Sequence, residues 1–578
     1  MARLHSVVLG GLLTLASCVS GATVATTSRS SSSKRDDFTE NLYIQPLPGG
    51  YVYYQFEFTT KTAAENSHFE LFPRPVAQLA SESGIDELYV TLTQGRWLRD
   101  TWGPAPNNTE APTGAEMWAW WPKASASNAT LSERWSTLRN AVSGLICASF
   151  STMGDELSSA PSPVVQSGIS AKDARSAPRE CIHGALPKEA TCTENLTPWV
   201  RLLPCRDRAG VGALLNPLHL FDVSYHAMSF RILTDASEGT VTLKQTLAIV
   251  KRRGSAQGKL SEAFPLLAHQ TRPDPSGGVR ACPLARESVV RVAGAAPQSL
   301  VGADGPADFA IPEGGDIEPR NDVTVHRFAT GHGQVGGGFR TVVRNARAAG
   351  SPAKVVLFQA FPFFVRPYFS SLKATLDGAP VALGTAPDAA ARVEIASGSE
   401  SGTATTLEIA TEIPPGAEFA VEVSFETVFL HFMRHPPDAN RGWDLPAGIV
   451  VVLPDAQNES PRRLCAEEIL LSLPTPDFSM PYNVIMFSCT VVAMFYGGLM
   501  SMSTRRMSVA FKNGKLSEET RFMRTWRLIF ATVYKFLMSL KNGAAKKLRR
   551  WKREKALANG ETPEISDDED DDEDEIDE

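Results

Sequence analysis

Short runs rich in β-branched and aromatic residues recur through the middle of the chain, and several alternate apolar with polar positions. Each run ends at Gly, Pro, Asp or Asn, as strands of a sheet usually do. The clearest runs cover residues 51–60, 87–97, 240–250, 353–361 and 420–432. Helical spacing is less frequent and occurs near Ala77, over 131–150 and over 209–221. The pattern therefore predicts a fold that is mainly β with some α.

The length and the turn-forming residues divide this region further. With 578 residues, the chain exceeds what one hydrophobic core usually fills. Its 39 Pro and 43 Gly exclude long helices across much of the middle. The stretch 277–309 is poor in apolar residues and suggests a linker. It would separate an N-terminal unit of mixed α and β (38–276) from a C-terminal β-sandwich-like unit (310–477).

The N-terminus carries a targeting pattern. Arg3 precedes an apolar run, and small residues at 20–22 suit cleavage. Residues 1–22 are therefore predicted to be a secretory signal peptide. The next stretch, 23–37, is polar and serine-rich, and it is predicted to be a disordered leader.

A long uncharged segment lies near the C-terminus. No charged side chain occurs between Phe478 and Arg505. This uncharged segment is long enough for a helix to cross a bilayer, and we place the transmembrane helix at 480–503. Pro481 marks the start of the membrane segment, and Arg505 with Arg506 marks its end. A buried core helix is the alternative, but these boundaries favour a membrane span.

The charge after this helix is strongly polarised, although the whole chain carries only −7. Residues 505–555 hold 16 Lys and Arg against 3 Glu, and residues 556–578 hold 13 acids and no Lys or Arg. Because cytoplasmic flanks are rich in Lys and Arg, the C-terminus is predicted to be cytosolic and the protein to be single-pass type I. Apolar and aromatic residues among the cations suggest an amphipathic segment on anionic headgroups. A second span is less favoured because Lys535 interrupts the apolar run, and no nucleic-acid module is present. The acidic end is predicted to be disordered.

A cysteine, Cys192, lies beside a glycosylation sequon, and this combination is typical of an oxidising lumenal compartment. Six cysteines are lumenal after removal of the signal: Cys147, Cys181, Cys192, Cys205, Cys282 and Cys465. They permit three internal bridges, or one bridge to another chain with at least one thiol left free. Cys147 lies in an apolar run and is expected to be a buried free thiol. The candidate N-glycosylation sites are Asn107, Asn128, Asn195 and Asn458.

Motifs for catalysis or cofactor binding are weak. Gly331, Gly333 and Gly336 have the spacing of a dinucleotide fingerprint, but the residues after them resemble a strand, so we interpret the loop as a turn and expect no cofactor. His431 and His435 are four residues apart, yet the strand-like run before them argues against a helical metal site. A cysteine and a histidine from distant segments still permit a nucleophilic dyad.

Three tryptophans, Trp118, Trp120 and Trp121, are clustered in the sequence. Such a cluster can stack on carbohydrate or lipid. Clustered aromatic residues more often form a core or partner-facing patch, and we favour that interpretation.

Six segments, spread in order along the chain, carry a family resemblance. They are HFELFPRPVAQL (68–79), ELYVTLTQGRW (87–97), GAEMWAWWP (114–122), CTENLTPW (192–199), HPPDANRGWD (435–444) and TPDFSMPYNVIMFSCTVVAMFYGG (475–498). Together they resemble the PIG-T family of subunits of the GPI transamidase complex. The resemblance extends from about Phe38 to Arg506, and the basic and acidic tails lie outside it.

The resemblance implies a non-catalytic glycoprotein of the endoplasmic reticulum membrane with a lumenal part rich in β-sandwich structure. The complex cleaves the C-terminal signal of a precursor protein and attaches a GPI lipid, and its nucleophilic cysteine lies on a separate, caspase-like subunit. In the family, the cysteine of the CTENLTPW segment forms an interchain disulfide with that subunit, which implies this role for Cys192. The alternative function is a membrane-anchored lumenal hydrolase or a carbohydrate-binding receptor.

Overall fold

The computed structural model describes most of the chain between residues 36 and 504. The described residues are 36–65, 69–123, 130–172, 178–254, 258–266, 278–303, 305–312, 322–331, 335–347, 352–386, 389–398, 403–435, 438–454, 460–477 and 479–504, with 531, 532, 535 and 538. They belong to two compact units, Met1–Asp477 and Phe478–Glu578, which we describe separately. The predicted signal peptide, Asn128, Asn458, Arg505, Arg506 and the acidic end lie outside the described residues.

One large sheet organises the N-terminal half of the first unit. Its strands are β1 (Asp37–Leu47), β2 (Tyr51–Ala63), β3 (Glu87–Gln94), β4 (Gly114–Pro122), β5 (Ser158–Ser159), β6 (Arg179–Leu186), β7 (Tyr225–Asp235), β8 (Thr240–Arg252), β9 (Glu287–Val292) and β10 (Gln298–Ser299). They lie in the order β10-β9-β1-β2-β8-β7-β3-β4-β6-β5. β1 and β9 pair in parallel, and the neighbours β1 and β2 pair antiparallel.

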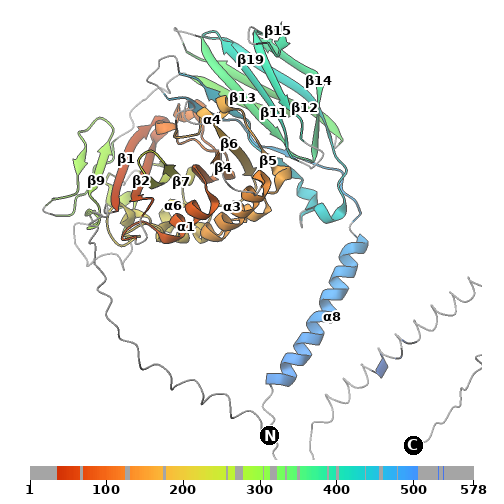
Figure 1. Cartoon of the computed structure of the whole chain (residues 1–578), viewed down its shortest axis with the longest axis horizontal. Helices are drawn as coiled ribbons and strands as arrows, with labels where there is room; N and C mark the ends of the chain where they lie inside the picture. Colours follow the sequence, from red (N-terminus) through yellow and green to blue (C-terminus); the bar gives the residue numbers. More distant parts are fainter. Residues whose placement is uncertain are drawn as a thin grey trace, which may run out of the picture. The chain divides into compact units, whose positions relative to one another are not determined.

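Most helices cover one side of this sheet, where Figure 1 shows α1, α3 and α6 lying together, whereas α2 and α4 pack on its other side. The longer helices are α1 (Arg74–Ser83), α3 (Leu131–Ile146) and α5 (Thr193–Arg201). The short ones are α2 (Arg99–Trp102), α4 (Pro163–Ser167), α6 (Pro217–Leu220) and α7 (Leu260–Ala263). A capping box starts α3, in which Thr130 accepts the N–H of Glu133 and the Glu133 carboxylate accepts that of Thr130. The buried positions of α3 recur at helical spacing: Trp135, Leu138, Val142 and Ile146.

The C-terminal half of this unit is a β-sandwich. One sheet has the order β11-β12-β19-β14-β15 and the other β16-β17-β18-β13-β21-β22. The strands are β11 (Val323–Thr330), β12 (Gly336–Asn345), β13 (Ala353–Phe361), β14 (Val365–Leu376), β15 (Ala379–Val381), β16 (Leu383–Gly384), β17 (Ala391–Ala396), β18 (Thr405–Ile413), β19 (Glu418–Thr427), β21 (Ile449–Val452) and β22 (Arg462–Cys465). Their facing side chains share one core, with Phe339 and Val421 from the first sheet and Leu357 and Ile409 from the second.

The strand β13 is apolar along nearly its whole length because both of its faces are buried. Leu357 belongs to the sandwich core, whereas its neighbours Val356 and Phe358 pack with Trp118 and Trp120 of β4 in a separate apolar cluster. Alternating side chains of one strand thus contact both halves of the unit. The tryptophan cluster is therefore core: Trp118, Trp120 and Trp121 are all fully buried.

Residues 277–309, the predicted linker, contain β9 and Cys282, and β9 pairs with β1. The limits of the two lumenal units stay a prediction. The sequence prediction of a mainly β fold is confirmed by the sheets above. A small pair, β20 (Trp443–Leu445) with β23 (Ile469–Leu471), completes the described strands.

The second unit contains α8 (Ser479–Thr504). Its residues Tyr482–Ser503 form an apolar helix of 22 residues, long enough to cross a membrane. This confirms the predicted C-terminal helix at 480–503, and Pro481 lies in its first turn, where proline is tolerated.

Several other predicted elements differ in detail. The run 420–432 is a strand only as far as Thr427, and His431 and His435 flank a single 3-10 turn, Phe432–Arg434, instead of sharing a helix face. The glycine loop joins the antiparallel strands β11 and β12, as predicted for a turn. The region 209–221 forms only a 3-10 turn, Val211–Leu214, and the one-turn helix α6.

Candidate functional site: the start of helix α5

The CTENLTPW segment folds as the start of helix α5, which the sequence patterns did not indicate. Cys192 precedes the helix with extended backbone, and its N–H donates to Asn195 Oδ1 at 2.9 Å. Leu196 and Trp199 are buried against the sheet, and Trp199 Nε1 donates to the carbonyl of Ser229 at 3.0 Å. A rigid apolar contact therefore fixes the helix that carries Cys192.

The start of α5 is tied to the end of α3. Asn195 is 2% exposed, and its Nδ2 donates to the carbonyls of Ile146 at 3.2 Å and Cys147 at 2.8 Å. A second bond joins the same segments, from the Ser149 N–H to Glu189 Oε1 at 2.8 Å. One buried amide thus connects the backbones of Cys147 and Cys192.

The prediction that Cys147 is buried was wrong, because the structure exposes it as a free thiol. The buried stripe of α3 ends at Ile146, so the next residue falls on another face of the helix. Cys147 also adopts the left-handed conformation, with φ of 55°, which turns the chain out of the helix. Exposed free cysteines therefore lie on both segments that Asn195 connects.

The other described cysteines of this unit are less available. Cys205 and Cys282 form a disulfide with a Cα–Cα distance of 6.1 Å. Burial raises the pKa of Cys181 well above its usual value and that of Cys465 to about 12. Since the thiolate is the reactive form, Cys147 and Cys192 are the candidates for exchange among the described residues of this unit.

Two sequons fall within the described residues, and their environments differ. Asn107 is exposed, and its Nδ2 donates one hydrogen bond, to Gln55 Oε1 at 2.8 Å. Asn195 is buried and uses both of its Nδ2 hydrogens. A glycan replaces one of those hydrogens, so the bonds of Asn195 are incompatible with a sugar on the folded chain.

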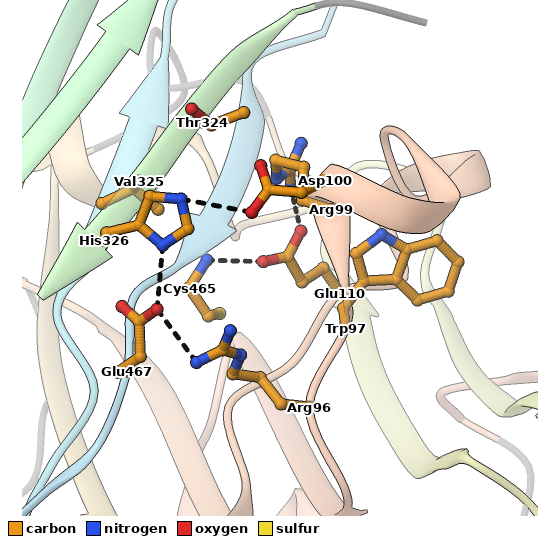
Figure 2. Close-up of a pocket in the computed structure, with 10 residues that line it drawn as sticks. All are labelled: Arg96, Trp97, Arg99, Asp100, Glu110, Thr324, Val325, His326, Cys465 and Glu467. Carbon is orange, nitrogen blue, oxygen red and sulfur yellow. Dashed lines mark hydrogen bonds and ion pairs between the residues drawn. The ribbon is translucent and has the colours of Figure 1, made fainter. Parts of the chain in front are cut away.

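A small polar pocket lies where the loop after β3 meets β11 and β22 (Figure 2). His326 Nδ1 lies 3.0 Å from Glu467 and its Nε2 lies 3.3 Å from Asp100, and Glu467 also pairs with Arg96 at 2.9 Å. Its volume of about 10 Å³ holds no more than a water molecule. These ion pairs join segments distant in sequence and leave no room for a substrate.

The pocket brings a cysteine and a histidine together, Cys465 and His326, yet it lacks the features of a nucleophilic dyad. Both ring nitrogens of His326 face carboxylates, so neither is directed at the thiol. Burial also keeps Cys465 protonated. The dyad that the sequence permitted is therefore not assembled here.

A chain of Ser159, His183 and Glu116 resembles a hydrolase triad in composition. Ser159 Oγ lies 3.4 Å from His183 Nδ1, and His183 Nε2 lies 3.2 Å from Glu116 Oε1. All three are buried, and Arg463 pairs with Glu116 at 2.7 Å. Burial raises the pKa of Glu116, but Arg463 and His183 outweigh it and lower the pKa to about 2. With no access for a substrate, this chain is a buried polar network that joins β4, β6 and β22.

The described residues thus define a class of protein: a large sheet-rich unit with an exposed thiol site, together with a helix able to span a membrane and no assembled catalytic centre among them. Residues 22–274 and 303–529 match the family model described as Gpi16 subunit, GPI transamidase component, and the chain belongs to this family. The match continues to residue 529, which corrects the expectation that family similarity ends at Arg506.

Named relatives agree with this family. A GPI transamidase component PIG-T homolog of Schizosaccharomyces pombe is 30% identical over 511 residues, covering 82% of this chain and 90% of the relative. The GPI-anchor transamidase component PIGT of Homo sapiens is 27% identical over 542 residues, covering 82% and 91%. GPI transamidase component GPI16 of Saccharomyces cerevisiae is 26% identical, covering 83% and 90%.

Proposed function

We propose that this chain is a non-catalytic structural subunit of GPI transamidase and that Cys192 tethers it by a disulfide to the caspase-like catalytic subunit. The observation that carries the tether is the exposed, free Cys192 at the start of a helix whose other face is buried. The family match supports membership in the complex.

The geometry suits a tether because the thiol has a rigid base. Leu196 and Trp199 fix α5 to the sheet, and Gln245 Nε2 donates to the Trp199 carbonyl at 2.8 Å. A covalent bond from such a position raises the effective concentration of the partner and limits its orientations. Transfer of a precursor carbonyl to a GPI amine depends on such positioning of reactants. This subunit would therefore supply orientation, while bond making belongs to the partner.

We further propose that the sheet-rich unit faces the lumen of the endoplasmic reticulum, that α8 spans its membrane, and that the C-terminus is cytosolic. The Cys205–Cys282 disulfide supports an oxidising compartment for the first unit. The cations after residue 504 support a cytosolic C-terminus.

Electrophoresis of the native complex without reductant tests the tether. Wild type should migrate as a mixed dimer that separates into two chains when reductant is added. The Cys192→Ser variant should form no mixed dimer. Cys147→Ser removes the other exposed thiol of the site and should retain the mixed dimer. If Cys192→Ser migrates like wild type without reductant, Cys192 is not the tether.

A further inference from the structure

The backbones of Cys147 and Cys192, the two exposed thiols of this site, are both hydrogen-bonded to the side chain of Asn195. The amide of Asn195 accepts the N–H of Cys192 at 2.9 Å and donates to the carbonyl of Cys147 at 2.8 Å. The backbones of both cysteines are therefore hydrogen-bonded to the same side-chain amide. The Ser149–Glu189 bond of 2.8 Å holds the same two segments a few residues away. A disulfide requires the two backbone segments to lie next to each other, and these bonds hold the segments of Cys147 and Cys192 together.

Both cysteines also lie at helix ends. Cys147 follows α3 and Cys192 precedes α5, so neither has its side chain packed inside a helix interface. Rotation of either thiol leaves the buried contacts of Ile146 and Trp199 intact. The remaining described free thiols of this unit, Cys181 and Cys465, have pKa values raised by burial and are poor competitors for exchange.

From this arrangement we infer that Cys147 is a resolving thiol, which exchanges the interchain disulfide of Cys192 for an intrachain Cys147–Cys192 disulfide. The inference rests on the proposed tether. The Cys147 thiolate attacks the Cys192 sulfur, the bond from Cys192 to the partner breaks, and the partner leaves as a thiolate. One disulfide replaces another, so no oxidant or reductant is consumed. The reverse reaction, attack of a partner thiolate on the intrachain bond, restores the tether.

The consequence is a reversible choice between two covalent states. With the partner bound, Cys192 joins the partner and Cys147 is a free thiol. When the partner departs, Cys147 closes on Cys192 and prevents that exposed thiol from forming other mixed disulfides. The device links assembly of the complex to thiol exchange at one surface.

Peptide mapping of the full-length chain tests the inference. The protein is made in cells that lack the disulfide-linked partner, where a disulfide of a lumenal thiol oxidoreductase replaces the partner disulfide as the bond that is exchanged and takes up the two electrons. The cells are acid-quenched, and the protein is alkylated with N-ethylmaleimide and digested without reduction. Mass spectrometry should find Cys147 and Cys192 in one disulfide-linked peptide pair as the predominant form. The Cys205–Cys282 pair serves as the internal control for folding and for preserved disulfides. Cys465→Ser should keep the Cys147–Cys192 pair, whereas Cys147→Ser should leave Cys192 alkylated.

Alkylation of both cysteines in the partner-free wild-type chain, or a glutathione adduct on either one, overturns the inference. The same mapping in cells with the partner separates the two claims. There, Cys147 should be alkylated and Cys192 should be linked to the partner. A Cys147–Cys192 pair without any mixed disulfide would remove the proposed tether and retain the intrachain pair.

Discussion

The start of α5 and the junction of the two sheet systems both collect residues suited to chemistry, but they use them differently. At the junction, Glu116, His183 and Arg463 are buried and satisfy one another. At the start of α5, Cys192 and Cys147 are exposed and have no disulfide partner in the structure. The difference shows that access, and not residue type, decides which cluster is available for function. Reactive residues at the junction hold the fold together, while those near α5 are accessible from solvent.

The strongest test of this contrast is to break the junction. Arg463→Ala leaves the Glu116 carboxylate buried without its guanidinium, which lies 2.7 Å away in wild type with both side chains nearly fully buried. We expect a loss of about 3–5 kcal/mol in unfolding free energy. Denaturant unfolding of the full chain in detergent measures it, and the fluorescence of Trp118 and Trp120 reports on the same junction.

The matched control is the exposed pair Arg434–Glu156, at 3.0 Å. Arg434→Ala should cost less than about 1 kcal/mol. Replacing both buried partners, with Glu116→Gln and Arg463→Met, should recover much of the loss because no unpaired charge remains. Equal effects of Arg463→Ala and Arg434→Ala would show that the junction does not depend on its buried charges.

A smaller loss is expected when the connector near α5 is removed. Asn195→Ala leaves the N–H of Cys192 and the carbonyl of Cys147 without their partner. We expect a loss of about 1–3 kcal/mol in unfolding free energy. The larger consequence should be functional, with slower formation of the mixed dimer because the tether segment is no longer fixed. Thr197→Ala, at an exposed position of the same helix, serves as control. An Asn195→Ala chain that forms the dimer at the wild-type rate would show that the connector is dispensable.

The sequence predicted much of the fold where local pattern and environment agree. The run 353–361 coincides with β13, and helix α3 begins at Leu131 as expected from its periodic apolar residues. The uncharged C-terminal segment was predicted to be a helix from its length and composition, and it coincides with α8. In these elements, period and length identify the structure without knowledge of what packs against it.

Features that depend on contacts between distant segments were not predicted from the sequence. Helix α5 contains Pro198 and several polar residues, and the burial of Leu196 and Trp199 offsets that weak propensity. Asp36 lies within the stretch 23–37 that was predicted to be a disordered leader, yet it is buried and accepts N–H groups, among them that of Phe72 at 2.9 Å. Family resemblance pointed to Cys192, while only the fold could show that Asn195 connects its segment to that of Cys147.

The dependence of stability on pH tests the charged state of Glu116 at the junction. The pKa of Glu116 is lowered from its usual 4.5 to about 2, so its ionised form is the one that stabilises the fold. This contribution is complete above about pH 4.5 and is lost as the pH falls toward 2. Unfolding free energies of wild type and Glu116→Gln, measured from pH 5 to 2, should therefore converge on the acid side. A constant difference across this range would contradict the charged state assigned to Glu116.

The smallest expected effect concerns the sugars, and it compares an exposed sequon with the one at the start of α5. Asn107 keeps one Nδ2 hydrogen free of protein contacts, whereas Asn195 donates both, to Ile146 and Cys147. A sugar on Asn195 would separate α3 from α5, so the folded chain should carry a glycan at Asn107 and none at Asn195. Asn107→Gln should migrate faster than wild type by one glycan, and Asn195→Gln should migrate unchanged. Faster migration of Asn195→Gln that enzymatic deglycosylation of both chains eliminates would show that α5 starts differently from the arrangement described above.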